Sequence, residues 1–111
     1  MAHPQFEIKK GADDKAYFNL TAKNGQVILS SQGYKTMAGC ENGIESVRKN
    51  SAEDSLFERK TAANDQVYFV LKAANNEVIG KSELYRSTQA MENGINSVRE
   101  NAPNAEVAKN Y

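Results

Sequence analysis

The sequence predicts an α+β fold built from two tandem β-β-β-α-β units. The first observation is an internal repeat, because within the 111 residues Tyr17-Phe18 returns as Tyr68-Phe69 and Glu41–Ile44 returns as Glu92–Ile95, each 51 positions later. The second observation is that each copy contains alternating apolar and polar residues followed by apolar residues at helical spacing. We therefore expect a single compact domain over residues 1–111, with repeat one at about 5–57 and repeat two at about 56–108. A unit of this size buries little surface alone, so the two copies should share one core.

Three strands open each unit. Phe6–Lys9 alternates and predicts the first strand, while Tyr17–Ala22 and Val27–Ser31 predict a hairpin. Asn24-Gly25 lies between them and is a strong signal for a two-residue turn. Such a turn pairs Leu20 with Leu29 and places one set of side chains on the core face. That set is Phe18, Leu20, Ala22, Val27 and Leu29, repeated as Phe69, Leu71, Ala73, Val78 and Gly80.

A helix follows the hairpin in each copy. Thr36 and Ser87 are suitable N-caps, and Met37, Cys40, Ile44 and Val47 recur at helical spacing behind the first of them. Gly43 and Gly94 lie on the same apolar stripe, which predicts a close approach of each helix to the sheet, since glycine inside a helix otherwise costs about 1 kcal/mol. Asn50 and Asn101 stand where each helix should end.

One more extended segment follows each helix. In the second copy it is Ala105–Ala108. Its counterpart in the first copy runs directly into the opening strand of the second copy. We therefore expect one continuous strand, about Ser55–Lys60, to end one unit and begin the next.

Several of these segments resemble the YegP-like family of small, mostly bacterial proteins. The resemblance rests on the hairpin Leu20–Gly25, on Gly33–Thr36 and above all on Ala38–Asn50, and it extends from Phe6 to Val107. It implies a single antiparallel sheet with both helices on one face and exchanged C-terminal strands. The family is of unknown function, so the resemblance implies no activity. The second copy departs from the motif at Gly80, Leu84 and Met91.

Composition argues against several classes of function. Lysine and arginine number 14, as do aspartate and glutamate, so strong non-specific binding of nucleic acid is not expected. No apolar run approaches the length of a membrane helix, and the N-terminus does not read as a secretory signal. Cys40 is the only cysteine, which rules out an intrachain disulfide. We expect a cytoplasmic monomer.

The sequence predicts neither an enzyme nor a metal or cofactor site. Cys40 lies on the apolar stripe and Met91 replaces it in the second copy, which favours a packing role. The single histidine, His3, lies in a predicted N-terminal tail, so no base stands near this thiol. His3–Glu7 resembles part of a streptavidin-binding tag but departs from it at Ile8, and we read it as a native terminus. Four helix residues with charged side chains are interpreted as solvated surface: Glu41, Arg48, Glu92 and Arg99.

The outer face of the sheet carries the candidate interaction site. If both helices cover one side, the other side should expose seven residues: Tyr17, Tyr68, Ile28, Ile79, Val70, Lys72 and Lys81. Such a face can be ordinary half-exposed sheet, a protein interface, or a surface that stacks bases of single-stranded nucleic acid. The sequence favours a small non-catalytic binding or protein-interaction module, with single-stranded nucleic-acid binding through the open face as the alternative.

Overall fold

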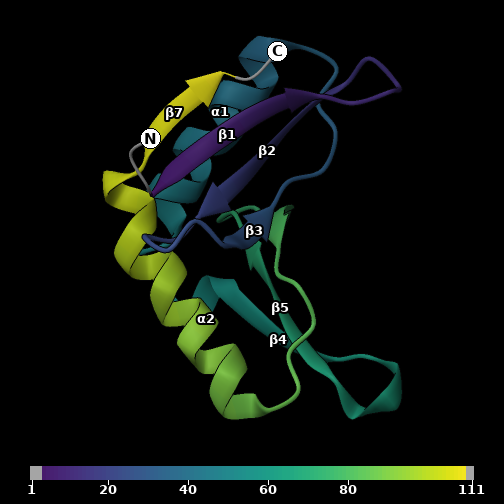
Figure 1. Ribbon diagram of the computed structural model, residues 1–111, viewed down its shortest axis with the longest axis vertical. Coiled ribbons are helices and arrows are strands. Elements are labelled where there is room, and N and C mark those ends of the chain that lie inside the picture. Colours follow the sequence, from purple (N-terminus) through teal and green to yellow (C-terminus); the bar gives the residue numbers. More distant parts are fainter. Residues whose placement is uncertain (1–3, 110–111) are drawn as a thin grey trace.

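A computed structural model shows seven strands and two α-helices in the described residues, 4–109 (Figure 1). The strands are β1 (Gln5–Lys10), β2 (Ala16–Thr21), β3 (Val27–Ser30), β4 (Phe57–Thr61), β5 (Val67–Lys72), β6 (Val78–Lys81) and β7 (Glu106–Lys109). The helices are α1 (Met37–Asn50) and α2 (Thr88–Asn101), with three short 3₁₀ turns, η1 (Asp54–Leu56), η2 (Ala63–Asp65) and η3 (Ala102–Asn104). Each repeat therefore supplies three strands and a helix, as predicted, and only the second continues into a separate last strand.

All seven strands form one sheet in the order β4-β5-β6-β3-β2-β1-β7. The expected exchange of last strands occurs in one direction: β7 from the second repeat pairs with β1 from the first, whereas the end of the first repeat continues into β4, which pairs with β5. This pair is parallel, with Phe6 opposite Val107, whereas every other strand pair is antiparallel, so the sheet is mixed and not wholly antiparallel as expected. The strand predicted over Ser55–Lys60 begins only at Phe57, because η1 occupies Asp54–Leu56.

The two repeats meet at the middle of the sheet through a narrow junction. β3 and β6 share one bridge pair, Ser30 with Lys81, so a pseudo-twofold axis passes between these strands. Leu29 and Gly80 occupy equivalent positions there. A Cβ atom on Gly80 would lie 2.6 Å from Leu29 Cδ2, so one leucine fills the space at the axis and glycine makes room for it.

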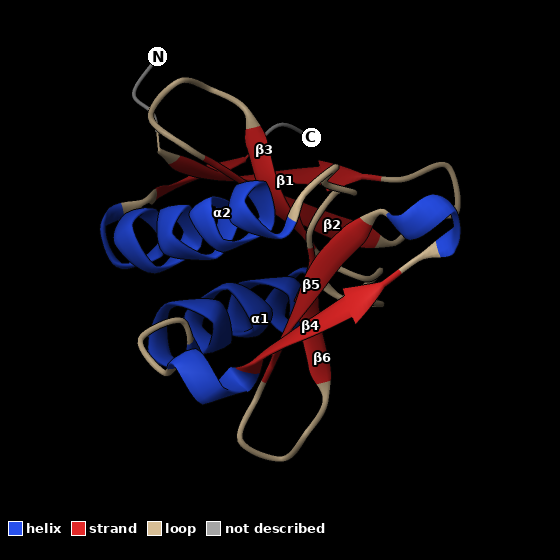
Figure 2. Ribbon diagram, turned by 90° about the horizontal axis from the view of Figure 1, so that it is seen from below, coloured by secondary structure: helices blue, strands red, loops and turns tan. Residues whose placement is uncertain are grey.

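Both helices lie on one side of the sheet (Figure 2). The predicted N-caps are confirmed: Gly39 N donates to Thr36 Oγ at 3.0 Å, and Ala90 N donates to Ser87 Oγ at 3.1 Å. The close approach at Gly43 is also confirmed, because a Cβ atom there would lie 2.7 Å from Tyr34 Cζ and 3.2 Å from Phe18. Gly94 meets Tyr85 and Phe69 in the same way.

The helices end at Asn50 and Asn101, as predicted. Ser51 caps α1 in right-handed conformation, and Asn50 is buried. The Asn50 side-chain amide donates to Ser46 O at 2.8 Å and to Ser46 Oγ at 3.1 Å. Asn101 repeats these bonds with Ser97. Each asparagine therefore satisfies groups inside its own helix and does not adopt a left-handed cap.

The hairpin loops are longer than predicted, and this changes the side of the sheet on which some residues of the returning strands lie. Ala22 N donates to Gln26 O at 2.9 Å, and Gly25 has φ 84°, so the loop contains three residues. Thr21 then pairs with Val27, and a bulge at Ile28 restores the predicted pair of Leu20 with Leu29. A shift of one residue moves a side chain to the opposite face. Val27 and its equivalent Val78, predicted to be core, are consequently 38% and 41% exposed.

A single hydrophobic cluster contains side chains from both repeats. Phe6, Phe18 and Leu29 of the first repeat belong to it, together with Phe69 and Leu71 of the second. Cys40 is fully buried in this cluster and Met91 is its buried equivalent, which confirms the packing role predicted for the thiol. Burial raises the pKa of the Cys40 thiol, which opposes formation of a nucleophilic thiolate.

Candidate functional site

Only part of the predicted interaction face is exposed. Lys81 is exposed and Tyr17, Tyr68 and Lys72 are half-buried. The other three were expected on the open surface but are buried: Ile28, Ile79 and Val70. Ile28 and Ile79 occupy the bulges that accompany the three-residue loops, and both join the hydrophobic cluster. Val70 lies in register between Glu58 and Lys81 on the neighbouring strands, whose long side chains can cover it.

The Tyr17 side chain is held in place by contacts with two neighbouring loops. Its hydroxyl donates to the Asp13 carboxylate at 2.6 Å, and a Cβ atom on Gly11 or on Gly33 would come within 3 Å of the ring. The hydrogen bond lowers the pKa of Asp13 and raises the pKa of Tyr17. The ring is thus packed against two glycine backbones, with little freedom to accept a stacked base.

Tyr68 has a different environment, formed by lysines. Lys81 Nζ lies 5.0 Å from the centre of its ring, a cation–π contact. Lys72 and Lys60 both contact the Glu58 carboxylate, and these two bonds lower the pKa of Glu58. Lys72 is therefore paired with a carboxylate, whereas Lys81 forms no ion pair with any residue in the range 4–109.

The two tyrosines lie too far apart to act as one stacking platform. Asn19 on β2 pairs with Ser30 on β3, Ser30 pairs with Lys81 on β6, and Lys81 pairs with Val70 on β5. Asn19 and Val70 therefore lie in one row across four adjacent strands. Tyr17 and Tyr68 each precede that row by two residues on strands of opposite direction. At about 3.3 Å per residue and about 4.8 Å per strand, their separation is about 20 Å.

A groove of about 380 Å³ opens at the junction between β3 and β6. Its lining consists of repeat equivalents: Val27 and Val78, Leu29 and Gly80, Ser30 and Lys81, Ser31 and Ser82, Gln32 and Glu83. The groove therefore lies on the pseudo-twofold axis. No helix residue lines it, so it opens on the side of the sheet away from α1 and α2.

The groove has an apolar centre, and two of its polar side chains, Ser31 and Ser82, are hydrogen-bonded to the backbone. Exposed Val27 and Val78 come from the two repeats, and buried Leu29 lies between them. Ser31 Oγ accepts from Phe18 N at 2.9 Å and donates to Gln32 O at 2.8 Å, and Ser82 repeats this arrangement with Phe69 and Glu83. These hydroxyls hold the strand backbones and are not poised as nucleophiles.

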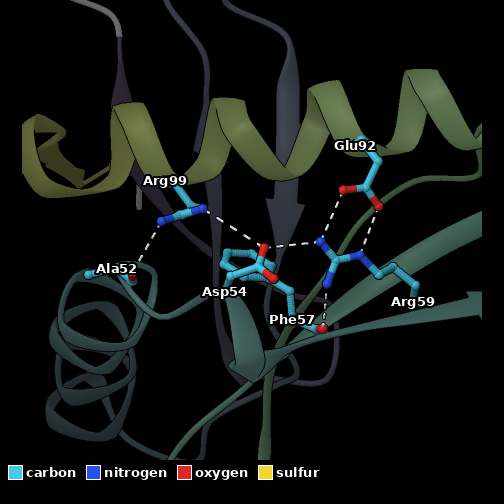
Figure 3. Close-up of polar contacts among 6 residues, drawn as sticks. All are labelled: Ala52, Asp54, Phe57, Arg59, Glu92 and Arg99. Carbon is cyan, nitrogen blue, oxygen red and sulfur yellow. Dashed lines mark hydrogen bonds and ion pairs between the residues drawn. The ribbon is translucent and has the colours of Figure 1, made fainter.

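A cluster of ion pairs links β4 to α2 (Figure 3). Arg59 forms two bonds with the Glu92 carboxylate, at 2.8 and 3.0 Å, and one with Asp54 at 3.0 Å. These bonds raise the pKa of Arg59, and Arg59 holds the pKa of Glu92 below its usual value. Arg99 lies 3.8 Å from the same Asp54 and donates to Ala52 O at 3.4 Å. Each charge is paired within the cluster, so the geometry favours a structural role, in which the ion pairs hold β4 and α2 together, over a catalytic role.

The helix charges interpreted as solvated surface are engaged in contacts. Arg48 donates to Ala105 O at 2.6 Å and its guanidinium lies 5.4 Å from the centre of the Phe6 ring. Glu41 pairs with Lys109 at 3.2 Å, as its equivalent Glu92 pairs with Arg59. One sequence signal points to the pairing of Glu92 with Arg59: Arg59 occupies the repeat position that apolar Ile8 holds in the first copy.

Neither a metal centre nor a membrane span is found in the part of the chain that the structure describes. Among residues 4–109, no three histidine, cysteine, aspartate or glutamate side chains gather as a metal site requires. His3 lies outside these residues. Within the same range, neither helix has the length and apolar character needed to cross a membrane.

Comparison with known proteins identifies the family. A family model described as a domain of unknown function, DUF1508, matches the chain twice, at residues 12–58 and 62–108. The chain belongs to the DUF1508 family. A UPF0339 protein of Acinetobacter baylyi is 49% identical over 102 residues, which cover 92% of each chain. The UPF0339 protein YegP of Yersinia pestis is 50% identical over 101 residues, covering 91% of this chain and 90% of that protein.

Solved structures of DUF1508 relatives show the same fold. The solution NMR structure of YegP from Escherichia coli, a protein of unknown function, matches with a TM-score of 0.92 at 42% identity, covering 99% of this chain and 95% of that chain. A UPF0339 protein of Shewanella oneidensis matches with a TM-score of 0.90 at 44% identity, over 95% and 89% of the two chains. The predicted family and two-repeat α+β fold are thus confirmed, and the family is uncharacterised.

Proposed function

We propose that this DUF1508 protein is a non-catalytic interaction module of the cytoplasm, which binds a short apolar segment of a partner protein in the β3–β6 groove. The observation that carries the proposal is the convergence of repeat equivalents on one apolar groove, with Val27 and Val78 exposed. Exposed apolar surface in a concave site is typical of binding surfaces. The free, buried thiol of Cys40 suits a reducing compartment.

The chemistry around the groove supports binding more than catalysis. Ser31 and Ser82 use their hydroxyls to hold backbone groups, and Lys81 is the one basic side chain in the lining. Glu83 is the one acidic side chain there. Neither Lys81 nor Glu83 forms the hydrogen-bonded pair of nucleophile and base that covalent catalysis needs.

Single-stranded nucleic-acid binding is the second candidate. The observation that favours it is Lys81 stacked on Tyr68, since cations and aromatic rings together bind single strands. It ranks second because Tyr17 is bonded to Asp13, Lys72 is paired with Glu58, and the formal net charge is zero.

Peptide display against the folded protein tests the proposal. We expect selection of peptides with apolar anchor residues, and amide shift changes concentrated in Val27–Gln32 and Val78–Glu83 when such a peptide is added to labelled protein. The double substitution Val27→Thr and Val78→Thr should weaken binding at least tenfold, because it keeps side-chain shape and removes apolar surface. Val107→Thr is the matched control, since Val107 is 37% exposed but lies outside this groove.

Two outcomes would contradict the proposal. One is selection of peptides whose binding survives the double valine substitution. The other is an absence of selected peptides together with salt-sensitive shifts at Tyr68 and Lys81 on addition of oligo-dT or oligo-rU, which would favour the nucleic-acid candidate.

A further inference from the structure

The groove between β3 and β6 is symmetric in its exposed apolar residues and asymmetric in its charges. Val27 and Val78 are repeat equivalents, and both are exposed in the lining. Two polar positions differ between the repeats, and each is neutral in the first repeat and charged in the second: Ser30 against Lys81, and Gln32 against Glu83. Every charged side chain in the lining therefore belongs to the second repeat.

This asymmetry gives the groove a direction. β3 and β6 are antiparallel and meet at the pair of Ser30 with Lys81, and each valine precedes its bridge residue by three positions. Val27 and Val78 therefore lie on opposite sides of that pair. A purely apolar segment could contact both valines in either of two opposite directions, because the pseudo-twofold rotation exchanges them. A charge supplied by one repeat alone stabilises one direction over the other.

Lys81 carries a charge that its neighbours do not neutralise. It is exposed, its Nζ lies 5.0 Å from the centre of the Tyr68 ring, and it forms no ion pair within residues 4–109. Glu58 lies in the same row across the sheet, but Lys60 and Lys72 contact its carboxylate. The Tyr68 ring thus positions the ammonium group and leaves its charge available to a bound molecule.

Glu83 reinforces the direction set by Lys81. β6 ends at Lys81, and Glu83 follows two residues later, about 7 Å further along an extended chain. Because the strands are antiparallel, Glu83 lies on the Val27 side of the bridge pair and Val78 lies on the other side. An acidic group of a bound segment is therefore attracted to Lys81 and repelled from the Val27 side.

We propose that Lys81 determines specificity in this groove, by binding an acidic residue that lies within about three residues of an apolar anchor in the partner segment. This inference rests on the function proposed above, because it concerns the same groove. Val78 precedes Lys81 by three residues, so an extended segment alongside β6 can place its anchor on Val78 and its carboxylate beside Lys81. The carboxylate fixes the direction in which the segment binds.

A double-mutant cycle between protein and peptide tests the role of Lys81. The probes are peptides selected by display against the wild-type protein, each paired with a version in which the acidic residue is replaced by its amide. Lys81→Ser copies the residue that the first repeat holds at this position. Lys72→Thr is the matched control, because it also copies the first repeat and removes a lysine that lies outside the groove. Amide spectra check that both variants are folded.

We expect the selected peptides to be enriched in acidic residues. Replacement of the acid by its amide should weaken binding to the wild type about threefold at low salt, as is typical of an exposed ion pair. The same replacement should have no effect with Lys81→Ser and an undiminished effect with Lys72→Thr.

The failure of this inference differs from the failure of the proposed function. Selected peptides that lack acidic residues, or an amide effect of equal size in the wild type and in Lys81→Ser, would overturn the role of Lys81 alone, provided that binding still requires both valines. Peptide binding that survives the double valine substitution would overturn both. Salt-sensitive shifts at Lys81 with oligo-dT, in the absence of any selected peptide, would also overturn both.

The direction of the segment is measured with a spin label on the peptide N-terminus. In the wild type, the label should broaden the amide signal of one valine, Val27 or Val78, more than that of the other. A variant that exchanges the charged and neutral positions carries four substitutions: Ser30→Lys, Gln32→Glu, Lys81→Ser and Glu83→Gln. In this variant the stronger broadening should move to the other valine. Equal broadening of both valines in the wild type, or an unchanged preference in the folded variant, would overturn the inference.

Discussion

Two glycines determine how closely the helices approach the sheet. Gly43 accommodates the ring of Tyr34, and Gly94 accommodates that of Tyr85. Tyr34 and Tyr85 in turn stack on Phe18 and Phe69, with ring centres 6.2 and 6.3 Å apart. The glycine signal was readable in the sequence because both repeats keep it within an apolar stripe. The identity of the contacting ring was not, since it comes from the loop before each helix.

Substitution of Gly43 by alanine should destabilise the protein although alanine is the better helix former. The added Cβ would lie 2.7 Å from Tyr34 Cζ, and overpacking of this kind costs about 1–3 kcal/mol. Urea unfolding followed by far-ultraviolet circular dichroism measures the loss. Gly39→Ala in the same helix is the control, because the atom nearest its Cβ is the Thr36 hydroxyl at 3.2 Å, and we expect no comparable loss.

The centre of the sheet needs one leucine, whichever strand supplies it. Leu29→Gly should cost about 3–5 kcal/mol through the cavity it leaves, and Gly80→Leu should also destabilise by crowding Leu29. The double substitution moves the leucine to the other repeat and should recover much of the loss. A double-mutant cycle in urea checks this coupling. Additive losses would mean that the two positions do not share one space.

At the scale of the elements, the residues of the hairpin do not specify the length of its loop. Asn-Gly is compatible with a two-residue turn and with a three-residue loop, and local residues alone do not choose between them. The structure has the longer loop plus a bulge, so Val27 and Ile28 exchange their predicted surroundings. The sequence therefore does not predict the groove, because the alternation places its exposed valines in the core.

The conformation of that loop gives a direct prediction. Gly25 has φ 84°, and an alanine there should cost about 1–2 kcal/mol through left-handed strain. Gly25→Asn should cost less, because Asn76 holds the equivalent position at φ 72° in the second repeat. Thermal unfolding of both variants ranks the losses, and an equal loss in the two would argue against strain as the cause.

The ion pairs of β4 predict how stability depends on pH. Hydrogen bonds from Lys72 and Lys60 lower the pKa of Glu58, and a bond from Arg59 lowers that of Glu92, both from 4.5. A carboxyl with a depressed folded pKa contributes stability that is present above its unfolded pKa and is lost as pH falls through the folded value. Unfolding free energy should therefore decline below pH 4.5.

Arg59→Gln should flatten this acid decline, because it removes the partner of Glu92. At neutral pH its cost should stay below about 1 kcal/mol, since the pair is partly exposed. Arg86→Gln serves as the control, because it removes the same charge from an exposed residue that forms no ion pair within residues 4–109. Urea titrations at a series of pH values compare the slopes, and equal slopes would contradict the role given to Arg59.

For the whole molecule, connectivity breaks the symmetry of two similar repeats. The end of repeat one must continue into β4, so η1 and β4 follow each other directly, whereas the end of repeat two is free to form β7 on β1. Periodicity predicted the faces of the strands correctly for Phe18 and Leu20. It could not predict the parallel direction of β7, because alternation identifies faces and not neighbours.

Severing the chain near Lys60 should leave neither part folded as a monomer. The first part would lack β7, which pairs with β1 at the sheet edge, and the second would lack β3 and α1, which supply part of the shared core. Amide spectra of each fragment at low concentration test this. A well-dispersed spectrum from a monomeric first fragment would contradict the shared core.

The claim that this molecule binds partners on its pseudo-twofold axis is tested most directly by intermolecular nuclear Overhauser effects. The protein would carry labelled valine and leucine methyl groups and be saturated with a display-selected peptide. We predict effects from peptide protons to the methyls of Val27 and Val78, and none to those of Val107. Effects confined to Val107, Leu84 or other positions away from the groove would contradict the account.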